Sequence, residues 1–181
     1  MTLITPEYKA LLREYRKPNS GGSSWGGGGG PHVPFVFDLI EAYEVETIID
    51  YGCGRGILLE SLINQRLVNP TNVCGYDPGV EGREIIDREA YDLLVSTDVL
   101  EHIEPECLSS VLEHMRSLAP MAYLNIHTGP AKAILPDGRN AHLIQKPWDW
   151  WKSVLEDHYS SVERYASGRF GDSRPSFLCH A

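Results

Sequence analysis

A glycine-rich turn with an acidic residue in front of it carries the strongest chemical signal in this sequence. It reads Asp50-Tyr51-Gly52-Cys53-Gly54-Arg55-Gly56, at the end of the β-branched run Thr47–Asp50. Glycines let the backbone turn sharply and let a ligand approach the main chain, and a helix beginning after the turn offers free N–H groups. Asp50 is placed to meet a positively charged end of that ligand. The turn therefore predicts a binding site for a small ligand.

A second carboxylate, Asp77, ends the next apolar run, Val73–Asp77. It follows the turn by about 20 residues, where a carboxylate commonly binds both hydroxyls of a ribose. The glycine spacing differs from that of dinucleotide-binding proteins, because Ile57 stands where their third glycine would be. The pair predicts a ligand that contains a nucleoside but no pyrophosphate. The alternative is an ordinary tight turn with a solvated Asp77.

Two histidines are candidates for proton transfer. His127 follows the apolar run Met121–Ile126, and His102 follows the run Asp92–Thr97. The ordinary pKa of histidine lies close to neutral pH, which suits a general base. The alternative for His127 is that it lines the site and takes no part in the reaction.

These residues need a framework that brings the ends of several strands together. Apolar residues at helical spacing alternate with short apolar runs, which predicts a Rossmann-like, doubly wound α/β domain. We expect one mostly parallel sheet with helices on both faces and a reversed last strand, and a ligand at the carboxyl ends of the strands. The expected helices are 35–43, 57–63, 108–118 and 148–155, and the expected strands are 47–50, 73–77, 92–97, 121–126, 161–165 and 176–179.

One segment, Ser20–Gly30, is low in complexity and contains Trp25 among glycines. It is either a flexible linker or a loop that folds over the ligand, and Trp25 favours the loop because a linker has little use for tryptophan. The predicted division is an N-terminal segment over residues 1–34 and one domain over residues 35–181. Three further tryptophans, at 148, 150 and 151, stand at helical spacing, which favours the core over a role in covering an acceptor.

The glycine turn and Asp77 resemble two motifs of the class I S-adenosylmethionine-dependent methyltransferases, and Tyr91–His102 resembles a third. The resemblance runs from about Phe35 to the C-terminus and implies S-adenosylmethionine as cofactor. One departure is the short segment between Asp77 and Asp92, where the family usually has a further strand, a helix and an adenine-binding acid. Weak substitutes there are Ile85, Ile86 and Asp87. The implied cofactor contacts are Asp50, Tyr51, Gly52, Gly54, Gly56, Asp77, Pro78, Thr97, Asp98 and the covering Trp25.

An acidic and histidine motif, Asp98-x-x-Glu101-His102, resembles that of the small-RNA 2′-O-methyltransferases and the ubiquinone-pathway O-methyltransferases. In the RNA group a later histidine completes a divalent-metal site, and His142 resembles that histidine. The resemblance implies Mg²⁺ or Mn²⁺ at these four residues, and two carboxylates with two imidazoles also suit Zn²⁺. The alternative is a metal-free network in which the histidines bond the carboxylates.

Composition narrows the choice of partner and compartment. The 181 residues suffice for one core. The net charge of −9 opposes binding to a nucleic-acid backbone, which would need a local basic patch. The chain has no apolar run that could span a membrane, and its first residues lack the apolar stretch of a secretory signal. The four cysteines are scattered and expected to be reduced, which favours the cytoplasm.

The sequence thus predicts an S-adenosylmethionine-dependent methyltransferase that methylates an oxygen of a small molecule or sugar by direct displacement. The enzyme alternative is a metal-dependent RNA 2′-O-methyltransferase, which a basic patch near His142, built on Arg139 and Lys146, would favour. The third possibility is a catalytically silent, methyltransferase-like binding subunit. The oligomeric state is left open.

Overall fold

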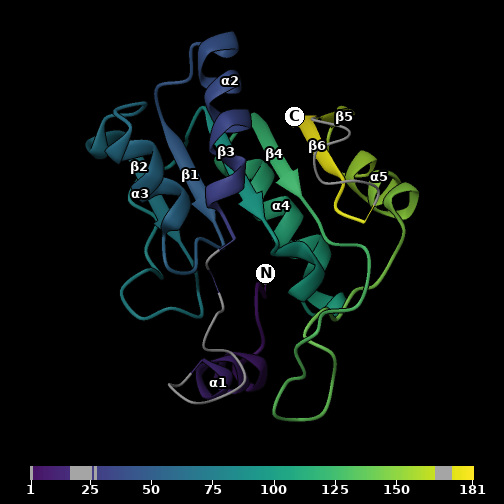
Figure 1. Cartoon of the computed structure of the whole chain (residues 1–181). Helices are drawn as coiled ribbons and strands as arrows, with labels where there is room; N and C mark the ends of the chain where they lie inside the picture. The colour runs from purple at the N-terminus through teal and green to yellow at the C-terminus, as the bar shows by residue number, and fades with distance from the viewer. Residues whose placement is uncertain (1, 17–25, 27, 166–172) are drawn as a thin grey trace.

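A six-stranded sheet forms the centre of the computed structural model, which describes residues 2–16, 26, 28–165 and 173–181 (Figure 1). The strand order is β2-β1-β3-β4-β6-β5. The first four strands run parallel, and β6 is antiparallel to both of its neighbours. The predicted mostly parallel sheet with a reversed last strand is confirmed. Its strands are β1 (Ile48–Tyr51), β2 (Val73–Tyr76), β3 (Leu93–Thr97), β4 (Met121–Asn125), β5 (Ser161–Tyr165) and β6 (Ser176–His180).

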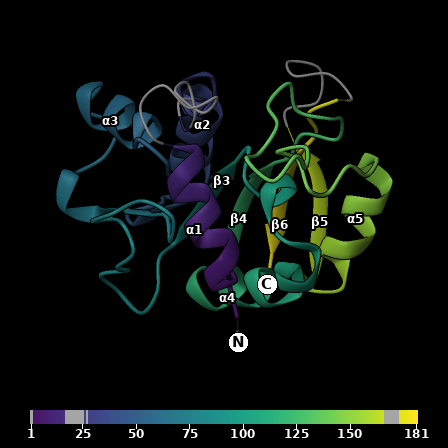
Figure 2. The same ribbon diagram turned by 90° about the horizontal axis from the view of Figure 1, so that it is seen from below.

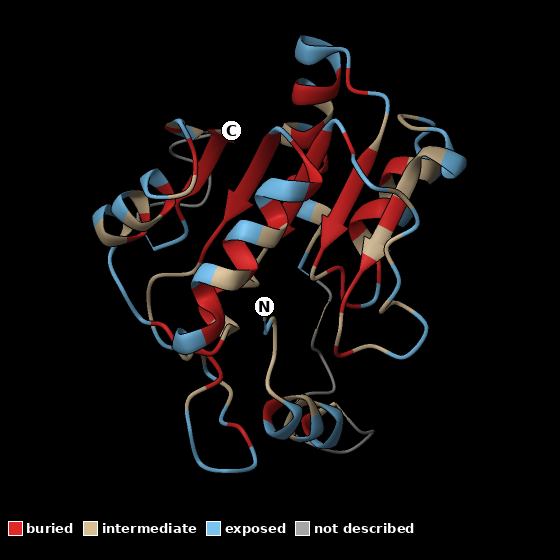
Figure 3. Ribbon diagram, turned by 180° about the vertical axis from the view of Figure 1, so that it is seen from behind, coloured by how far each residue is buried: buried red, intermediate tan, exposed pale blue. Residues whose placement is uncertain are grey.

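The central strands are continuous apolar runs because helices cover both faces of the sheet. Successive side chains of a strand point to opposite faces. Ile48 of β1 accordingly packs in the layer that contains α2 (Val33–Tyr43) and α3 (Ile57–Asn64), whereas Ile49 packs in the layer of α4 (Leu108–Leu118) and α5 (Trp148–Glu156). Figure 3 shows the buried sides of these helices turned toward the sheet.

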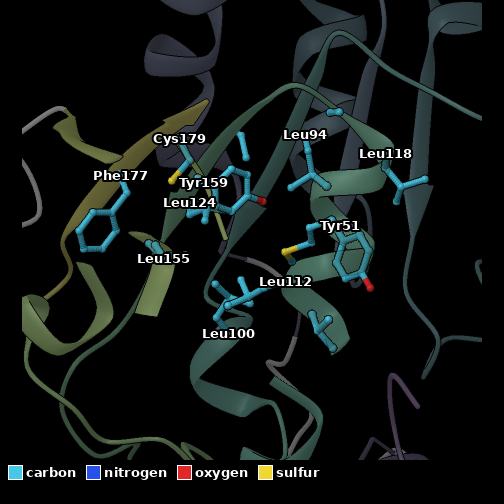
Figure 4. Close-up of a cluster of buried hydrophobic side chains, with 14 of the residues drawn as sticks. Tyr51, Leu94, Leu100, Leu112, Leu118, Leu124, Leu155, Tyr159, Phe177 and Cys179 are labelled. Carbon is cyan, nitrogen blue, oxygen red and sulfur yellow. The ribbon is translucent and has the colours of Figure 1, made fainter. Parts of the chain in front are cut away.

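The layer around α4 and α5 holds the larger part of the core. Leu94 and Leu124 of the sheet meet Leu112 of α4 and Leu155 of α5 in this cluster (Figure 4). Trp151 is fully buried there, and the other two tryptophans of α5 are partly buried against it. The expectation that these tryptophans belong to the core is confirmed.

Helix α1 (Pro6–Tyr15), which the sequence pattern does not predict, lies beyond the carboxyl ends of the parallel strands (Figure 2). Thr5 caps its N-terminus by accepting a hydrogen bond from the Tyr8 amide. Tyr8 and Tyr15 are buried against Leu135 and other residues of the connection between β4 and α5. The apolar face of α1 therefore packs on a distant segment at the edge of the sheet.

The segment between β2 and β3, residues 77–92, is described throughout and contains no helix or strand. The shortened connection that the sequence indicates is therefore confirmed, and β2 forms one edge of the sheet. Short 3₁₀ turns complete the fold at 30–32, 70–72, 100–102 and 105–107. Within the described part of the chain, every helix is too short or too polar to cross a membrane.

Candidate active site

A cavity of about 730 Å³ lies where the carboxyl ends of β1, β2 and β3 meet α1 and the connection that follows β4. This is the edge at which α/β sheets bind ligands. Gly54, Gly56 and Glu101 do not line the cavity. The other described residues that the sequence singles out for cofactor, catalytic or metal roles do line it: Asp50, Tyr51, Gly52, Asp77, Pro78, Thr97, Asp98, His102, His127 and His142.

The glycine turn is shaped by its contacts with other backbone segments. Gly54 has a φ of 51°, and a Cβ atom there would lie 2.7 Å from the Cα of Gly26. The amide of Arg55 donates a 3.2 Å hydrogen bond to the carbonyl of Gly26. The sequence predicts that a ligand approaches Gly54, whereas the structure places the glycine-rich N-terminal segment directly against it.

That segment reaches the cavity with three of its glycines. Gly26, Gly28 and Gly29 line it, and a Cβ atom at Gly29 would lie 2.7 Å from the side chain of Leu58 on α3. Trp25, the expected cover of the cofactor, lies outside the described residues, as do residues 20–24. The described glycines agree with a segment that packs beside the ligand site.

Asp77 is held at the end of β2 by main-chain hydrogen bonds. Its carboxylate accepts the amides of Gly54 at 3.2 Å and Gly79 at 2.9 Å. The guanidinium of Arg16, just after α1, lies 3.5 Å from the same carboxylate. Asp77 therefore joins the glycine turn to α1 while its side chain faces the cavity.

Asp50 is the second carboxyl group on this side of the cavity, and it is 4% exposed. Burial raises its pKa to about 7, and the nearby charge of Asp77 adds to the increase. A group with this pKa changes its charge near neutral pH. A cationic ligand beside Asp50 would favour the charged form.

Helix α1 spans the cavity and is attached on both sides. Near its start, Thr5 donates from its amide and its hydroxyl to the carboxylate of Glu104, at 2.9 and 2.6 Å. Near its end, Arg16 pairs with Asp77. In between, the hydroxyl of Tyr8 donates to the carbonyl of His102 at 2.9 Å. Opening the cavity on this side requires these contacts to break.

Thr5→Val should weaken the attachment of α1 while leaving the sheet intact. The change removes the N-cap and the hydroxyl bond to Glu104, and each such contact contributes about 1 kcal/mol. Amide hydrogen exchange in residues 6–15 should accelerate by about tenfold or more, whereas exchange in β1 and β3 should not change. Thr5→Ser, which keeps the hydroxyl, is the control. Equal exchange in both variants would show that Thr5 does not hold α1.

Asp98, Glu101, His102 and His142 meet on the other side of the cavity. One potential ligand atom from each residue lies within 4.8 Å of those of the others. The first three follow β3, and the fourth comes from the connection after β4, which folds back over this edge. Asp98 has a φ of 61°, and its amide donates to the carbonyl of Asn125 at 3.0 Å.

The two histidines of this cluster have the same tautomer. Nδ1 of His102 lies 2.7 Å from the carbonyl of Ala141, and Nδ1 of His142 lies 2.6 Å from the carbonyl of Gly129. A carbonyl only accepts, so each Nδ1 carries the proton and each Nε2 keeps its lone pair. Backbone carbonyls orient metal-binding histidines in the same way. Burial, followed by the neighbouring His142, lowers the pKa of His102 to about 4, which keeps its ring neutral.

Glu101 is fully buried beneath the other three residues. Its Oε1 accepts the amide of His127 at 2.7 Å, and its Oε2 has no hydrogen-bond partner among the described residues. Burial and the charge of Asp98 raise the pKa of Glu101 well above its usual value. Burial also tends to raise the pKa of Asp98, but the neighbouring His102, Glu101 and Arg174 side chains outweigh it and lower that pKa. Without a cation, the two carboxyl groups would share one proton.

His127 lines the cavity, but its hydrogen bonding suits its ring to donate a hydrogen bond better than to accept a proton. Its Nδ1 accepts the amide of Gly129 at 3.2 Å, so the proton of the neutral ring is on Nε2. Burial lowers its pKa, and the charge of Arg174 lowers it further. The neutral ring thus has no free lone pair for a substrate proton, whereas Nε2 of His102 has one.

Several residues that line the cavity were missed by the sequence analysis, and three weak candidates for adenine contacts lie outside it. Helix α1 contributes Leu12 and Tyr15. Among the described residues, four cations from separate parts of the chain line the cavity: Arg16, Arg55, Lys132 and Arg174. No motif in the sequence connects them. Ile85 is 79% exposed, and neither it nor Ile86 nor Asp87 lines the cavity, so the structure gives no support to the suggested adenine contacts there.

A parallel sheet with a glycine turn after β1 and an acid after β2 is the architecture of the class I S-adenosylmethionine-dependent methyltransferases. The chain belongs to the methyltransferase domain family, whose profile matches residues 9–166. No curated protein sequence matches it.

Solved structures of methyltransferases share the fold at low sequence identity. The Burkholderia thailandensis 1,6-didemethyltoxoflavin-N1-methyltransferase is 15% identical, with a TM-score of 0.62 over 99% of this chain and 92% of that one. The magnesium protoporphyrin IX methyltransferase of Synechocystis PCC 6803 is 19% identical, with a TM-score of 0.56 over 99% and 100% of the two chains. The small RNA methyltransferase HEN1 is 15% identical, with a TM-score of 0.59 over 83% of this chain and 25% of that one.

Proposed function

We propose that this protein transfers the methyl group of S-adenosylmethionine to a hydroxyl oxygen of a small molecule or sugar. The observation that carries the proposal is that one cavity joins two groups of side chains. Asp50, the glycine turn and Asp77 form one side, and the cluster around Asp98 and His102 forms the other. A cofactor on the first side would direct its methyl group toward the second.

The cofactor's parts match the groups on the first side. The ribose hydroxyls would donate to Asp77, which the amides of Gly54 and Gly79 already orient. The ammonium of the methionine part would lie near Asp50, with the backbone at Tyr51 and Gly52 beside it. The remaining cofactor contacts are proposed for Pro78 and Thr97 and for Asp98 of the other side, all of which line the cavity. Structures of similar fold contain bound S-adenosylhomocysteine or S-adenosylmethionine.

The reaction would be a direct displacement at the methyl carbon. The acceptor oxygen forms a bond to this carbon as the bond between carbon and sulfur breaks. The electron pair of that bond stays on sulfur and gives S-adenosylhomocysteine. In a site without a bound cation, the hydroxyl proton would pass to Nε2 of His102, while His127 donates a hydrogen bond to the acceptor. A cation bound at Nε2 would occupy that lone pair, and the hydroxyl proton would then leave to solvent. The protein would act mainly by positioning the two reactants and excluding water.

The cluster also fits a divalent cation, which we propose as Mg²⁺ or Mn²⁺. Two observations support the fit: the unpaired buried oxygen of Glu101 and the Nε2 lone pairs of His102 and His142. A cation offsets the cost of burying two carboxyl groups side by side. It would be held by Asp98, Glu101, His102 and His142, and when bound it would lower the pKa of the acceptor hydroxyl.

Calorimetry followed by a transfer assay tests the proposal. Titration with S-adenosylmethionine, S-adenosylhomocysteine and NAD should give binding of the first two and none of NAD. Hydroxyl compounds incubated with the cofactor labelled in its methyl group should then acquire the label. Binding of NAD alone would refute the proposed cofactor, and labelling only of amines would refute oxygen as the acceptor.

Methylation of RNA at a 2′-hydroxyl is the second candidate, and the four-residue cluster is the observation that favours it. The basic patch expected for an RNA enzyme lacks support. Arg139 pairs with Asp137 at 2.7 Å and stacks over Tyr8, and Lys146 lies over Trp150 outside the cavity. We therefore favour the small acceptor. A catalytically silent subunit is less favoured still, because such a protein has no need of the buried cluster.

Cofactor binding should strengthen as the pH rises toward 7. The folded protein holds a proton on Asp50 up to about pH 7, and the cofactor's ammonium must displace it. Calorimetry from pH 5 to 8 should show affinity for S-adenosylhomocysteine increasing by up to about tenfold per pH unit below 7 and then levelling. Asp50→Asn should bind more weakly and lose this dependence. An unchanged pH profile in the variant would contradict the role of Asp50.

The stability of the cofactor-free protein should fall as the pH rises toward 7, whereas the affinity for the cofactor rises. The raised pKa of Asp50 favours the folded state fully below about pH 4, where the unfolded chain is also protonated, and this contribution is lost as pH rises through about 7. Urea unfolding of Asp50→Asn should therefore depend less on pH across this window than that of the parent protein.

A further inference from the structure

We propose that Arg83, in the segment between β2 and β3, is a positioning residue that holds the glycine turn and Asp77 in a fixed relation to each other. The inference rests on the proposed function and adds to its cofactor site a residue that does not itself line the cavity. The main chain of Arg83 bonds to Asp77, and its side chain bonds to the glycine turn. Arg83 would therefore act on the cofactor through these two groups.

The main chain of Arg83 fixes the amide of Asp77. After β2 the chain turns back, and the carbonyl of Arg83 accepts this amide at 2.8 Å. The amide of Arg83 donates to the carbonyl of Val80 at 3.1 Å, and the amide of Val80 donates to the carbonyl of Asp77 at 3.1 Å. Residues 77–83 thus form a turn that is closed by main-chain hydrogen bonds. The same bonds place Asp77 and the start of the Arg83 side chain.

The half-buried side chain of Arg83 reaches from this turn to the glycine turn. Its Nη2 donates to the carbonyl of Arg55 at 3.3 Å, and its Nη1 donates to Sγ of Cys53 at 3.7 Å. Cys53 and Arg55 both line the cavity. Because the guanidinium is planar and rigid, two contacts from its two ends fix its orientation. The glycine turn is thereby held by a group outside the cavity.

Two glycines leave the space that this guanidinium occupies. A Cβ atom at Gly56 would lie 2.8 Å from Nη2 of Arg83, and a Cβ atom at Gly75 of β2 would lie 2.8 Å from Nη1. Gly56 is the last glycine of the turn, and it does not line the cavity. Gly75 does not have a positive φ that would call for glycine. Room for the Arg83 side chain therefore accounts for glycine at both positions better than room for a ligand does.

The charge of Arg83 gives this arrangement a property that can be measured at Asp50. Burial is the main cause of the raised pKa of Asp50; among the charged groups, Asp77 raises this pKa further and Arg83 lowers it. The nearby Cys53 thiol stays protonated, because burial raises its pKa to about 12. Loss of the cation should raise the pKa of Asp50 above about 7. The ammonium of the cofactor would then meet a charged carboxylate only at a higher pH.

Arg88 provides a matched control within the same segment. Its guanidinium also donates to a main-chain carbonyl, that of Thr71, which precedes β2 at the end of the strand opposite the cavity. Arg88 does not line the cavity either. A variant of Arg88 therefore loses an equivalent anchor of the segment without touching the contacts to the glycine turn.

Calorimetry with S-adenosylhomocysteine at pH 7 is the first measurement. Arg83→Gln should weaken binding by about tenfold or more, because both contacts to the turn and the charge near Asp50 are lost. Arg88→Gln should bind as the parent protein does. Urea unfolding should show that both variants are folded under the conditions of the titration.

A pH series then separates positioning from a merely structural role. In Arg83→Gln the pH at which affinity levels should rise by at least about 0.5 unit from its value near 7. Arg83→Lys keeps the charge but has a single ammonium in place of the guanidinium. It should keep the pH profile of the parent and lose affinity only severalfold.

Two results would overturn the inference. One is an affinity and pH profile of Arg83→Gln equal to those of the parent protein. The other is an equal loss of affinity in Arg83→Gln and Arg88→Gln, which would assign the effect to general loosening of the segment. If the parent protein binds no S-adenosylhomocysteine, the proposed function itself fails and the inference fails with it.

Discussion

Gly54→Ala is expected to reduce the affinity for S-adenosylmethionine by about 30-fold to 100-fold, which corresponds to about 2–3 kcal/mol. The new Cβ atom would lie 2.7 Å from the Cα of Gly26 and 3.1 Å from its carbonyl oxygen. Both are backbone atoms, so the collision cannot be relieved by turning a side chain. Either the glycine turn or the segment at Gly26 must move, and the bonds from Arg55 to Gly26 and from Gly54 to Asp77 would be lost.

Gly82→Ala separates this collision from simple backbone strain. Gly82 has a φ of 82°, and a Cβ atom there would meet nothing within 4 Å. Alanine at either position should cost about 1 kcal/mol of stability because of the positive φ. Only Gly54→Ala should lose cofactor affinity in calorimetry. Similar affinities for the two variants would show that contact with Gly26 does not shape the site.

Removal of divalent cations is expected to abolish methyl transfer while cofactor binding persists. Asp98 is the one proposed ligand that is also a proposed cofactor contact, and the main contacts Asp50 and Asp77 are not ligands, so a chelator should leave most of the affinity for S-adenosylhomocysteine intact. His142→Ala removes one Nε2 donor and should raise the Mg²⁺ or Mn²⁺ concentration needed for half-maximal activity by about tenfold to a hundredfold. Activity assays across metal concentrations, with elemental analysis of the purified protein, provide the measurement.

His158→Ala is the matched control, because His158 lies outside the cavity and its amide bonds only to the carbonyl of Leu155. Its metal requirement should equal that of the parent protein. Full turnover in excess chelator, together with no bound metal, would leave the polar network as the correct description. In that network Glu101 would carry the proton that it shares with Asp98.

The sheet was predictable because its signals are local. The runs around Ile48 and Leu93 are buried on both faces, so they read as uninterrupted apolar segments. Helix α1 was not predictable, because the burial of Tyr8 and Tyr15 depends on Leu135, more than a hundred residues away. Nothing in the neighbouring sequence of either tyrosine indicates that partner.

The residues of the site likewise divide into those that local sequence predicts and those that only tertiary contacts place. Asp50 and Asp77 follow directly from strand ends, and both line the cavity at the positions that the motif indicates. The role of Gly54 could not be inferred, since the close approach of Gly26 is a tertiary contact. The cations Lys132 and Arg174 belong to no motif at all. They line the cavity only because the segments after β4 and before β6 fold back over this edge of the sheet.

The placement of β6 has a consequence for how the chain acquires its structure during synthesis. This strand follows the other five in the sequence, yet it lies between β4 and β5. Its His180 pairs with Met121 of β4 on one side and with Ser161 of β5 on the other. Until β6 leaves the ribosome, β5 has no partner and β4 exposes a free edge. The nascent chain therefore presents an unpaired apolar strand that other chains could join. Complete pairing of the sheet must follow synthesis of this segment, and we expect chaperone contacts to concentrate on β4 until then.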